Sequence, residues 1–397
     1  MNTPLTIQQR NAVLNAVAQL IASEKETILA ANKIDLESYK GDDISMFDRL
    51  KVDDSKIDGM ILSLKQLVAD SDPIGKELYH FTHENGMKIV NKTAAFGTVM
   101  IIYESRPDVT VEAAGIAFKS GNKILLKGGK ESLNSNLEIV KLWHQALTEN
   151  NITTDWVEYL NYNRTETQAF LENPTQKIDL IVPRGGEKLI AFVKKNAQCP
   201  VIVSGRGNNF IYVDAEADLD LALNVIINGK DKISACNAVD KILINYNLDG
   251  KETFIKNLIS KLSEENIEIF GDSELTTFNN VKPYESAAIW YKEFLDYKIV
   301  IGSIDSTEEA ISKINHYSGG HSAVIITKND TTADYFMSSV DTAAVYQNAS
   351  TRFTDGGQFG LGGELAISTD KLHHRGPMGL HHLVTNKWYI KGNGQIR

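Results

Sequence analysis

The sequence is poor in the features that mark disulfide-rich, membrane or nucleic-acid-binding proteins. Its 397 residues include only two cysteines, Cys199 and Cys236, too few for a disulfide framework. No apolar run approaches the roughly 18 residues that a membrane helix needs. The 51 acidic residues outnumber the 41 basic ones, giving a net charge of −10, and an acidic surface repels phosphate backbones. We therefore expect no membrane span and no nucleic-acid partner.

The composition is that of an ordinary globular protein. Hydrophobic residues make up 42% of the chain and charged residues 23%. The opening residues, 1–9, show no basic start followed by an apolar segment, so we expect no secretory leader and a cytoplasmic location. At about 150 residues per domain, the length predicts two or three domains.

Local patterns predict helices first and then a hairpin. Thr6 and Gln9 have the spacing of a capping box at the start of a helix. A second helical pattern covers about 55–69. Residues 79–95 alternate in polarity and hold Glu84-Asn85-Gly86, which predicts a hairpin with Asn-Gly at its turn.

From residue 98 onward, short apolar runs alternate with helical patterns. This alternation predicts α/β domains with parallel sheets covered on both faces. The strands expected in a first sheet are 99–103, 123–127, 156–160, 178–182, 201–203 and 210–213. A second unit begins near Gly229, with strands expected at 241–245, 298–301, 323–327 and 343–347.

Two familiar phosphate-binding motifs are absent. Neither G-x-G-x-x-G after a strand nor G-x-x-x-x-G-K-[ST] occurs. Glycine pairs flanked by basic residues stand instead at two strand-to-helix junctions, Lys127-Gly128-Gly129-Lys130 and Arg184-Gly185-Gly186. Glycine there lets the backbone approach an anion at a helix N-terminus. A phosphate-bearing cofactor and a tight turn without ligand both remain open for these pairs.

The two cysteines have different surroundings. Cys199 begins an apolar strand, which favours a buried, unreactive thiol. Cys236 lies among small and polar residues, where a thiolate nucleophile is possible. No histidine is placed by sequence to act as its base, which favours acyl transfer without activation of water. The pairs His373-His374 and His381-His382 lack completing ligands, so no metal site is expected.

Several longer stretches, taken in order, resemble the γ-glutamyl phosphate reductase family of the aldehyde dehydrogenase superfamily. The most specific of them is the stretch from Asn348 to Gly362, which contains Asp355-Gly356-Gly357-Gln358-Phe359. The other matching stretches are 103–111, 119–122, 126–131, 181–186, 236–237 and 374–388. The likeness covers essentially the whole chain.

The resemblance implies an aldehyde-dehydrogenase-like α/β fold with two parallel-sheet domains and a small β oligomerisation element. Residues 1–228 would be the cofactor-binding domain, with the hairpin 79–95 as the oligomerisation element. Residues 229–360 would be the catalytic domain. The tail, 361–397, would return to the cofactor domain and take part in oligomerisation, so a homo-oligomer is implied.

The implied activity is NADPH-dependent reduction of L-glutamyl 5-phosphate to L-glutamate 5-semialdehyde and phosphate, the second step of proline biosynthesis. The chain is too short for a fused kinase domain, so a separate glutamate 5-kinase would supply the acyl phosphate. Two alternatives stay open: another acyl-reducing member of the superfamily that acylates coenzyme A, and a catalytically silent α/β protein that binds a nucleotide.

The resemblance also assigns the nucleophile and the cofactor-binding residues. Cys236 matches the nucleophile, and Glu293 matches the glutamate that holds the nicotinamide ribose. Lys127 matches the lysine that holds the adenosine ribose. Lys130 stands where other aldehyde dehydrogenases have a glutamate, and a cation there suits the 2′-phosphate of NADPH. The remaining cofactor contacts are expected from Gly185 and Gly186.

Substrate contacts are expected from three further residues. Arg106 would stabilise the leaving phosphate, and Asn348 and Arg352 would hold the substrate's α-carboxylate, although Arg352 could equally hold the tail loop to the core. The family's general-base position falls near Ile202, and its oxyanion asparagine near Ser105, which leaves the oxyanion donor open. Lys232-Ile233 replaces the family's usual basic-proline pair before the nucleophile, so the geometry of that loop is open too.

Overall fold

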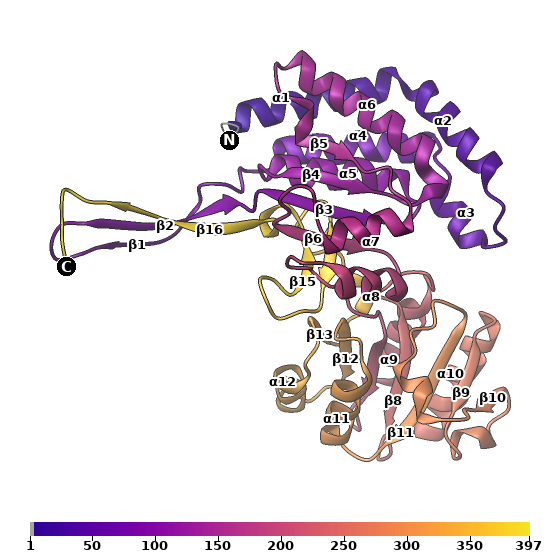
Figure 1. Cartoon of the computed structure of the whole chain (residues 1–397). Coiled ribbons are helices and arrows are strands. Elements are labelled where there is room, and N and C mark those ends of the chain that lie inside the picture. Colours follow the sequence, from indigo (N-terminus) through magenta and orange to yellow (C-terminus); the bar gives the residue numbers. More distant parts are fainter. Residues whose placement is uncertain (1–3) are drawn as a thin grey trace. The chain divides into compact units, whose positions relative to one another are not determined.

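Two compact units make up the chain in the computed structural model, which describes residues 4–397 (Figure 1). The first unit extends to Val203 and takes in Gly360–Ala366 and Met378–Arg397. The second comprises Ser204–Phe359 and Ile367–Pro377. Residues 1–3 lie outside the described residues. They are the first part of the stretch 1–9, for which no secretory leader is expected.

Eight α-helices of the first unit are arranged in layers around a small sheet (Figure 1). The capping box of Thr6 and Gln9 is present at the first of them, as predicted. The bounds are α1 Ile7–Ser23, α2 Lys25–Ser38, α3 Ile44–Leu50, α4 Asp54–Ala69, α5 Pro107–Lys119, α6 Leu133–Glu149, α7 Arg164–Glu172 and α8 Glu187–Asn196. Short 3-10 turns lie at η1 Lys130–Ser132, η2 Thr154–Trp156 and η6 Leu380–His382.

The sheet of the first unit has four parallel strands in the order β5-β4-β3-β6. Their bounds are β3 Thr98–Tyr103, β4 Lys123–Lys127, β5 Val157–Tyr159 and β6 Leu180–Arg184. Alternate residues of β3 point to opposite faces, since Ile101 belongs to one apolar cluster and Met100 to another. The sheet is therefore buried on both sides, as the apolar strands predicted. The expected strand 201–203 is reduced to one isolated bridge between Val201 and Ile181.

The second unit holds a seven-stranded parallel sheet in the order β10-β9-β11-β8-β7-β12-β13. The strand bounds are β7 Asn209–Val213, β8 Val239–Asn245, β9 Glu268–Gly271, β10 Val281–Pro283, β11 Lys298–Ile304, β12 Ser322–Ile326 and β13 Ala344–Gln347. The helices are α9 Leu219–Lys230, α10 Lys251–Glu264, α11 Thr307–Tyr317 and α12 Asp330–Ser339, with 3-10 turns η3 Leu275–Thr277, η4 Ala287–Tyr291 and η5 Thr351–Phe353.

The border between the units lies at Val203 and not at the predicted 228. The reason is β7, which was expected in the first sheet but pairs in parallel with β8 and β12 of the second. Periodicity shows that a segment is a strand, but it does not show which strand lies beside it.

The C-terminal tail is also divided differently from the predicted single segment 361–397. Ile367–Pro377 belongs to the second unit, and the flanking pieces belong to the first. Two short strands, β14 Ala366–Ser368 and β15 Gly376–Met378, pair with each other where the chain crosses the border.

A three-stranded antiparallel arm extends from the first unit (Figure 1). It consists of β1 Glu77–Thr82, β2 Lys88–Ala95 and the last strand, β16 Val384–Lys391. The predicted hairpin and its Asn85-Gly86 turn are confirmed, with Gly86 at a φ of 84°. Large apolar side chains of the arm are exposed: Leu78, Tyr79, Phe81, Trp388, Tyr389 and Ile390.

Within residues 4–397, no helix combines the length and the apolar character that crossing a membrane requires.

Candidate functional site

The predicted cofactor residues of the first unit gather at one edge of its sheet. Lys127 ends β4 and Lys130 follows it, while Gly185 and Gly186 follow β6. Strands β4 and β6 flank β3, so these residues share the carboxyl edge of the sheet. After β3 the chain continues to β4 on one side of it, and later strands add β6 on the other side, so the strand order changes direction at β3. The point between β3 and β6 is where ligands bind in open parallel sheets.

Two glycines at the carboxyl edge of this sheet, Gly129 and Gly185, lie where a larger side chain would overlap neighbouring atoms. A Cβ at Gly129 would overlap the Ser105 hydroxyl, and one at Gly185 would lie 2.7 Å from the Glu104 carboxylate. The exposed backbone at Gly185 and Gly186 leads into the N-terminus of α8, where partial positive charge gathers. Two lysines and the N-terminus of α8 form a donor set suited to a phosphate-bearing dinucleotide.

Glu104 is a residue of this edge that sequence reasoning missed. Its carboxylate accepts the Gly186 N–H at 2.8 Å, and Arg49 lies 3.8 Å from its other oxygen. An acidic side chain thus occupies the helix N-terminus in this structure. The sequence carries Glu104 between the matched residues Tyr103 and Ser105, but spacing alone does not show that it reaches α8.

Lys127 and Arg106 already have local partners. The Lys127 ammonium donates to the Gly128 carbonyl at 2.6 Å, and burial lowers the pKa of this lysine although Glu131 opposes that effect. Arg106 forms an ion pair with Asp108 at 2.8 Å, within the first turn of α5. Lys130 is exposed.

Cys236 lies in the second unit, in the exposed segment between α9 and β8. Its carbonyl oxygen accepts a hydrogen bond from the Asn209 side chain at 2.8 Å. Gly207 packs so closely against the same carbonyl that a Cβ there would overlap it. The backbone of Cys236, the predicted nucleophile, is therefore held by a tight loop before β7. By contrast, Cys199 is half-buried, and desolvation raises the pKa of its thiol, as expected for an unreactive cysteine.

Arg352 reaches the residue next to the nucleophile. Its guanidinium donates to the side-chain oxygen of the buried Asn237, and the Thr351 hydroxyl donates to the Asn237 carbonyl at 2.6 Å. The Asn237 amide donates in turn to the Thr354 carbonyl at 3.0 Å. Arg352 thus holds its loop to the segment of Cys236, in line with the predicted role of fastening the tail loop to the core.

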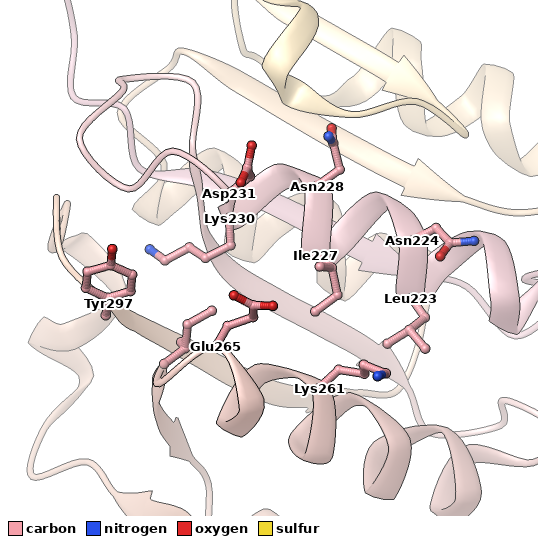
Figure 2. A pocket seen from close by; sticks show the side chains of 10 residues that line it. Leu223, Asn224, Ile227, Asn228, Lys230, Asp231, Lys261, Glu265 and Tyr297 are labelled. Carbon is pink, nitrogen blue, oxygen red and sulfur yellow. The ribbon is translucent and has the colours of Figure 1, made fainter.

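A cavity of about 430 Å³ lies beside this contact, wholly within the second unit. It brings two cations together with two carboxylates. Its lining residues are Asn228, Asp231, Lys232, Asn237, Arg352, Phe353, Asp355 and Gln358. Asn348 is not among them, because its side-chain amide bonds the backbone N–H and carbonyl of Thr327. A second cavity, of about 440 Å³, lies between α9 and α10 and contains none of the predicted site residues (Figure 2).

Glu293 is brought to the same loop as Cys236. Its carboxylate accepts the Gly207 N–H at 2.9 Å. Gly207 therefore contacts both the segment of the nucleophile and the carboxylate predicted to hold the nicotinamide ribose. The tract Gly205-Arg206-Gly207-Asn208-Asn209 has two glycines before a strand, which indicates a close backbone approach but does not identify its partners.

Across residues 4–397, no three His, Cys, Asp or Glu side chains gather into a group that could hold a metal ion. Of the histidine pairs, His374 bonds the Pro377 carbonyl at 3.0 Å, and His382 accepts the Gly379 N–H at 3.1 Å.

Known proteins match the chain over nearly its whole length. Residues 3–274 match the aldehyde dehydrogenase family. The sequence is 42% identical to a gamma-glutamyl phosphate reductase of Clostridium botulinum over 395 residues, 99% of this chain and 95% of that protein. This chain belongs to the gamma-glutamyl phosphate reductase family, within the aldehyde dehydrogenases. The family resemblance read from the sequence is therefore confirmed, and the chain is an oxidoreductase.

Solved structures agree with this assignment. The gamma-glutamyl phosphate reductase of Thermotoga maritima is 39% identical, with a TM-score of 0.94 over 99% of this chain and 95% of that one. The NADP-complexed glyceraldehyde-3-phosphate dehydrogenase of Methanocaldococcus jannaschii, at 16% identity, has a TM-score of 0.69 over 98% and 90% of the two chains, and it shows the shared fold alone. The predicted aldehyde-dehydrogenase-like α/β fold is confirmed. Neither alternative, a coenzyme A-acylating enzyme or a silent nucleotide-binding protein, is favoured.

Proposed function

We propose that this protein reduces L-glutamyl 5-phosphate to L-glutamate 5-semialdehyde and phosphate, using NADPH, as the second step of proline biosynthesis. The observation that carries the proposal is the exposed Cys236, whose backbone carbonyl is held by Asn209, in a chain that covers 95% of its gamma-glutamyl phosphate reductase relative. A thiolate there can attack an acyl carbon and split one difficult reduction into two easier steps.

In the first step, the Cys236 sulfur bonds to the acyl carbon, the carbon–oxygen bond to phosphate breaks, and phosphate leaves with the electron pair. Backbone N–H groups near Cys236 would stabilise the oxyanion, and Arg106 would stabilise the departing phosphate. When bound, NADPH would supply the hydride that reduces the thioester carbon, and Lys127, Lys130 and Glu293 are among the residues that would hold it. The resulting hemithioacetal then releases the aldehyde, and the sulfur regains its charge.

The general-base position of the superfamily holds no carboxylate in this chain. This supports a thioester that exchanges its acyl group with phosphate and is not hydrolysed by water. The superfamily's general-base position falls near Ile202, which is a buried aliphatic residue in this structure. A carboxylate at that point would activate water against the thioester. An aliphatic side chain cannot do so, and the acyl group is kept for reduction.

The cavity beside Asn237 suits the amino-acid end of the substrate. Arg352 and Lys232 provide cations for an α-carboxylate, while Asp231 and Asp355 provide carboxylates for an α-ammonium group. Arginine can bind a carboxylate through two parallel hydrogen bonds. We assign the glutamyl head group to this cavity.

An absorbance assay at about 340 nm, the nicotinamide band, tests the activity in reverse. The semialdehyde, inorganic phosphate and NADP⁺ should together give NADPH, and omission of phosphate should stop the reaction. Reduction that requires coenzyme A in place of phosphate, or no reduction with either, would contradict the proposal.

The residues Lys127, Lys130, Gly185 and Gly186 would hold the cofactor at the edge of the first sheet. Lys130 is exposed and stands where other aldehyde dehydrogenases are expected to have a glutamate. In Lys130→Glu, the new carboxylate should repel the 2′-phosphate of NADPH. We expect the ratio of kcat/KM for NADPH to that for NADH to fall by about tenfold or more. The matched control is Lys65→Glu, an exposed lysine of the same unit on α4. An unchanged ratio would reject the role of Lys130.

The arm fits a homo-oligomer. Its exposed apolar side chains, Trp388 and Ile390 among them, would be covered by another copy of the chain. Sedimentation of the full chain should therefore show a species larger than 44.0 kDa. A monomer at micromolar concentration would contradict this.

We also propose a separate glutamate 5-kinase as the source of the acyl phosphate, and a cytoplasmic location, since a thiol nucleophile needs a reducing compartment.

A further inference from the structure

The segment 290–294, which carries Glu293, is fastened along its whole length by groups from elsewhere in the second unit. Each residue has its own tether. The bonds are Asn208 to the Trp290 carbonyl at 2.7 Å, Arg206 to the Tyr291 carbonyl at 2.8 Å, Lys241 to the Lys292 carbonyl at 2.7 Å, Gly207 N–H to the Glu293 carboxylate at 2.9 Å and Phe294 N–H to the Asp240 carboxylate at 2.8 Å. We call this segment the Glu293 strap.

Two of these tethers come from buried charges at the start of β8. Asp240 is 2% exposed and pairs at 2.7 Å with Lys230, which is also 2% exposed. Lys241 is fully buried, and its ammonium lies 4.2 Å from the centroid of the Phe294 ring. Burial lowers the pKa of Lys241 to about 7, although the Asp240 carboxylate opposes this shift.

Burying three ionisable groups in one place is expensive. Apolar residues of similar volume often stabilise a fold as well as a buried ion pair does, or better. What charged groups add is directional bonding, because each one fixes a chosen backbone atom. Here both chosen atoms, the Lys292 carbonyl and the Phe294 N–H, directly flank Glu293. The tethers thus fix the backbone on either side of one carboxylate.

We propose that Asp240 and Lys241 are positioning residues, which fix the Glu293 strap so that the Glu293 carboxylate meets the ribose of the nicotinamide half of the cofactor. This rests on the proposed function, in which Glu293 binds that ribose. A carboxylate that accepts hydrogen bonds from sugar hydroxyls must be placed to within about 0.5 Å. The tethers on both sides of Glu293 provide that precision, and the Asp240 and Lys241 side chains that form them are buried.

Replacement of Lys241 by methionine tests the proposal, because methionine keeps an apolar stem against Phe294 and removes the donor. Binding of NADPH, followed by its fluorescence, should weaken by about tenfold, the size expected when a charged hydrogen bond is lost. The KM for NADPH should rise in parallel. Lys241→Arg restores a donor and should bring the dissociation constant back to within about threefold of the parent.

The matched control is Lys313→Met. Lys313 lies 3.9 Å from the centroid of the Trp290 ring in the same strap, where it makes a cation–π contact. This variant should leave NADPH binding unchanged. Alkylation of Cys236 by iodoacetamide and the thermal midpoint report whether the fold survives, and both should stay near the parent values in Lys241→Met.

Three results would overturn the proposal: parent-like NADPH binding in Lys241→Met, an equal loss in Lys313→Met, or no recovery in Lys241→Arg. If Lys241→Met does not fold, Lys241→Gln replaces it, since glutamine keeps a shorter neutral donor and should weaken binding to a lesser degree. The parent's phosphate-dependent activity is measured first. Its absence would count against the proposed function, whereas the NADPH titrations do not depend on turnover.

Discussion

Replacing Cys236 by alanine should abolish phosphate-dependent formation of NADPH from the semialdehyde, with a loss of at least about a thousandfold. The reason is that every step of the proposed reaction forms or breaks a bond to this sulfur. Because Cys236 is exposed and its neighbours are held through their backbone, the variant should fold like the parent. The measurement is the initial rate at about 340 nm, together with circular dichroism.

The chain supplies its own control for this result. Cys199→Ala removes the other thiol, which is half-buried and whose pKa is raised by desolvation, so its activity should stay close to that of the parent. Mass spectrometry of acid-quenched turnover should find a glutamyl adduct on the peptide that contains Cys236 and none on the peptide with Cys199. Appreciable turnover by Cys236→Ala would end the thioester mechanism.

The second large effect is expected from one methyl group at Gly207. In Gly207→Ala, the new Cβ would overlap the Cys236 carbonyl oxygen, so the nucleophile segment has to move. The same shift would disturb the bond from the Gly207 N–H to Glu293. Displacement of reacting groups by about 1 Å can cost a hundredfold in rate, and we expect kcat/KM to fall by about that factor.

A glycine in open space provides the comparison. A Cβ at Gly59, in α4, would meet nothing within 4 Å. Gly59→Ala should therefore leave kcat/KM unchanged and should raise stability by about 0.5–1 kcal/mol, because alanine favours a helix. Comparable loss of activity in both variants, or full activity in Gly207→Ala, would show that the loop before β7 does not position the nucleophile.

Local signals in the sequence predicted the local structure well. The capping box at Thr6 and the Asn85-Gly86 hairpin depend on neighbours only a few residues away, and the structure has both. The placement of β7 was wrong because strand pairing depends on residues far along the chain. Helices α2 and α3 and the strands β9 and β10 were not predicted, since they are short or carry a weak apolar pattern.

For the candidate site too, the sequence predicted some features and missed others. The residues at the sheet edge could be predicted because the carboxyl ends of adjacent parallel strands must lie together. The fastening of Cys236 and Glu293 through Gly207 could not, because it joins segments more than twenty residues apart through backbone atoms. No pattern of side-chain types records such contacts. The buried pair of Lys230 and Asp240 is equally hidden, since charged residues ten apart usually lie on a solvated surface.

The position of β16 has a consequence for synthesis on the ribosome. Strand β2 pairs along its length with β16, whose residues are among the last to be translated. While the second unit emerges and folds, that side of β2 has no partner, and an open strand edge invites pairing with other nascent chains. Strand β2 carries Lys88 and Lys92. Their positive charge discourages pairing with other nascent chains until β16 has left the ribosome and can pair with β2.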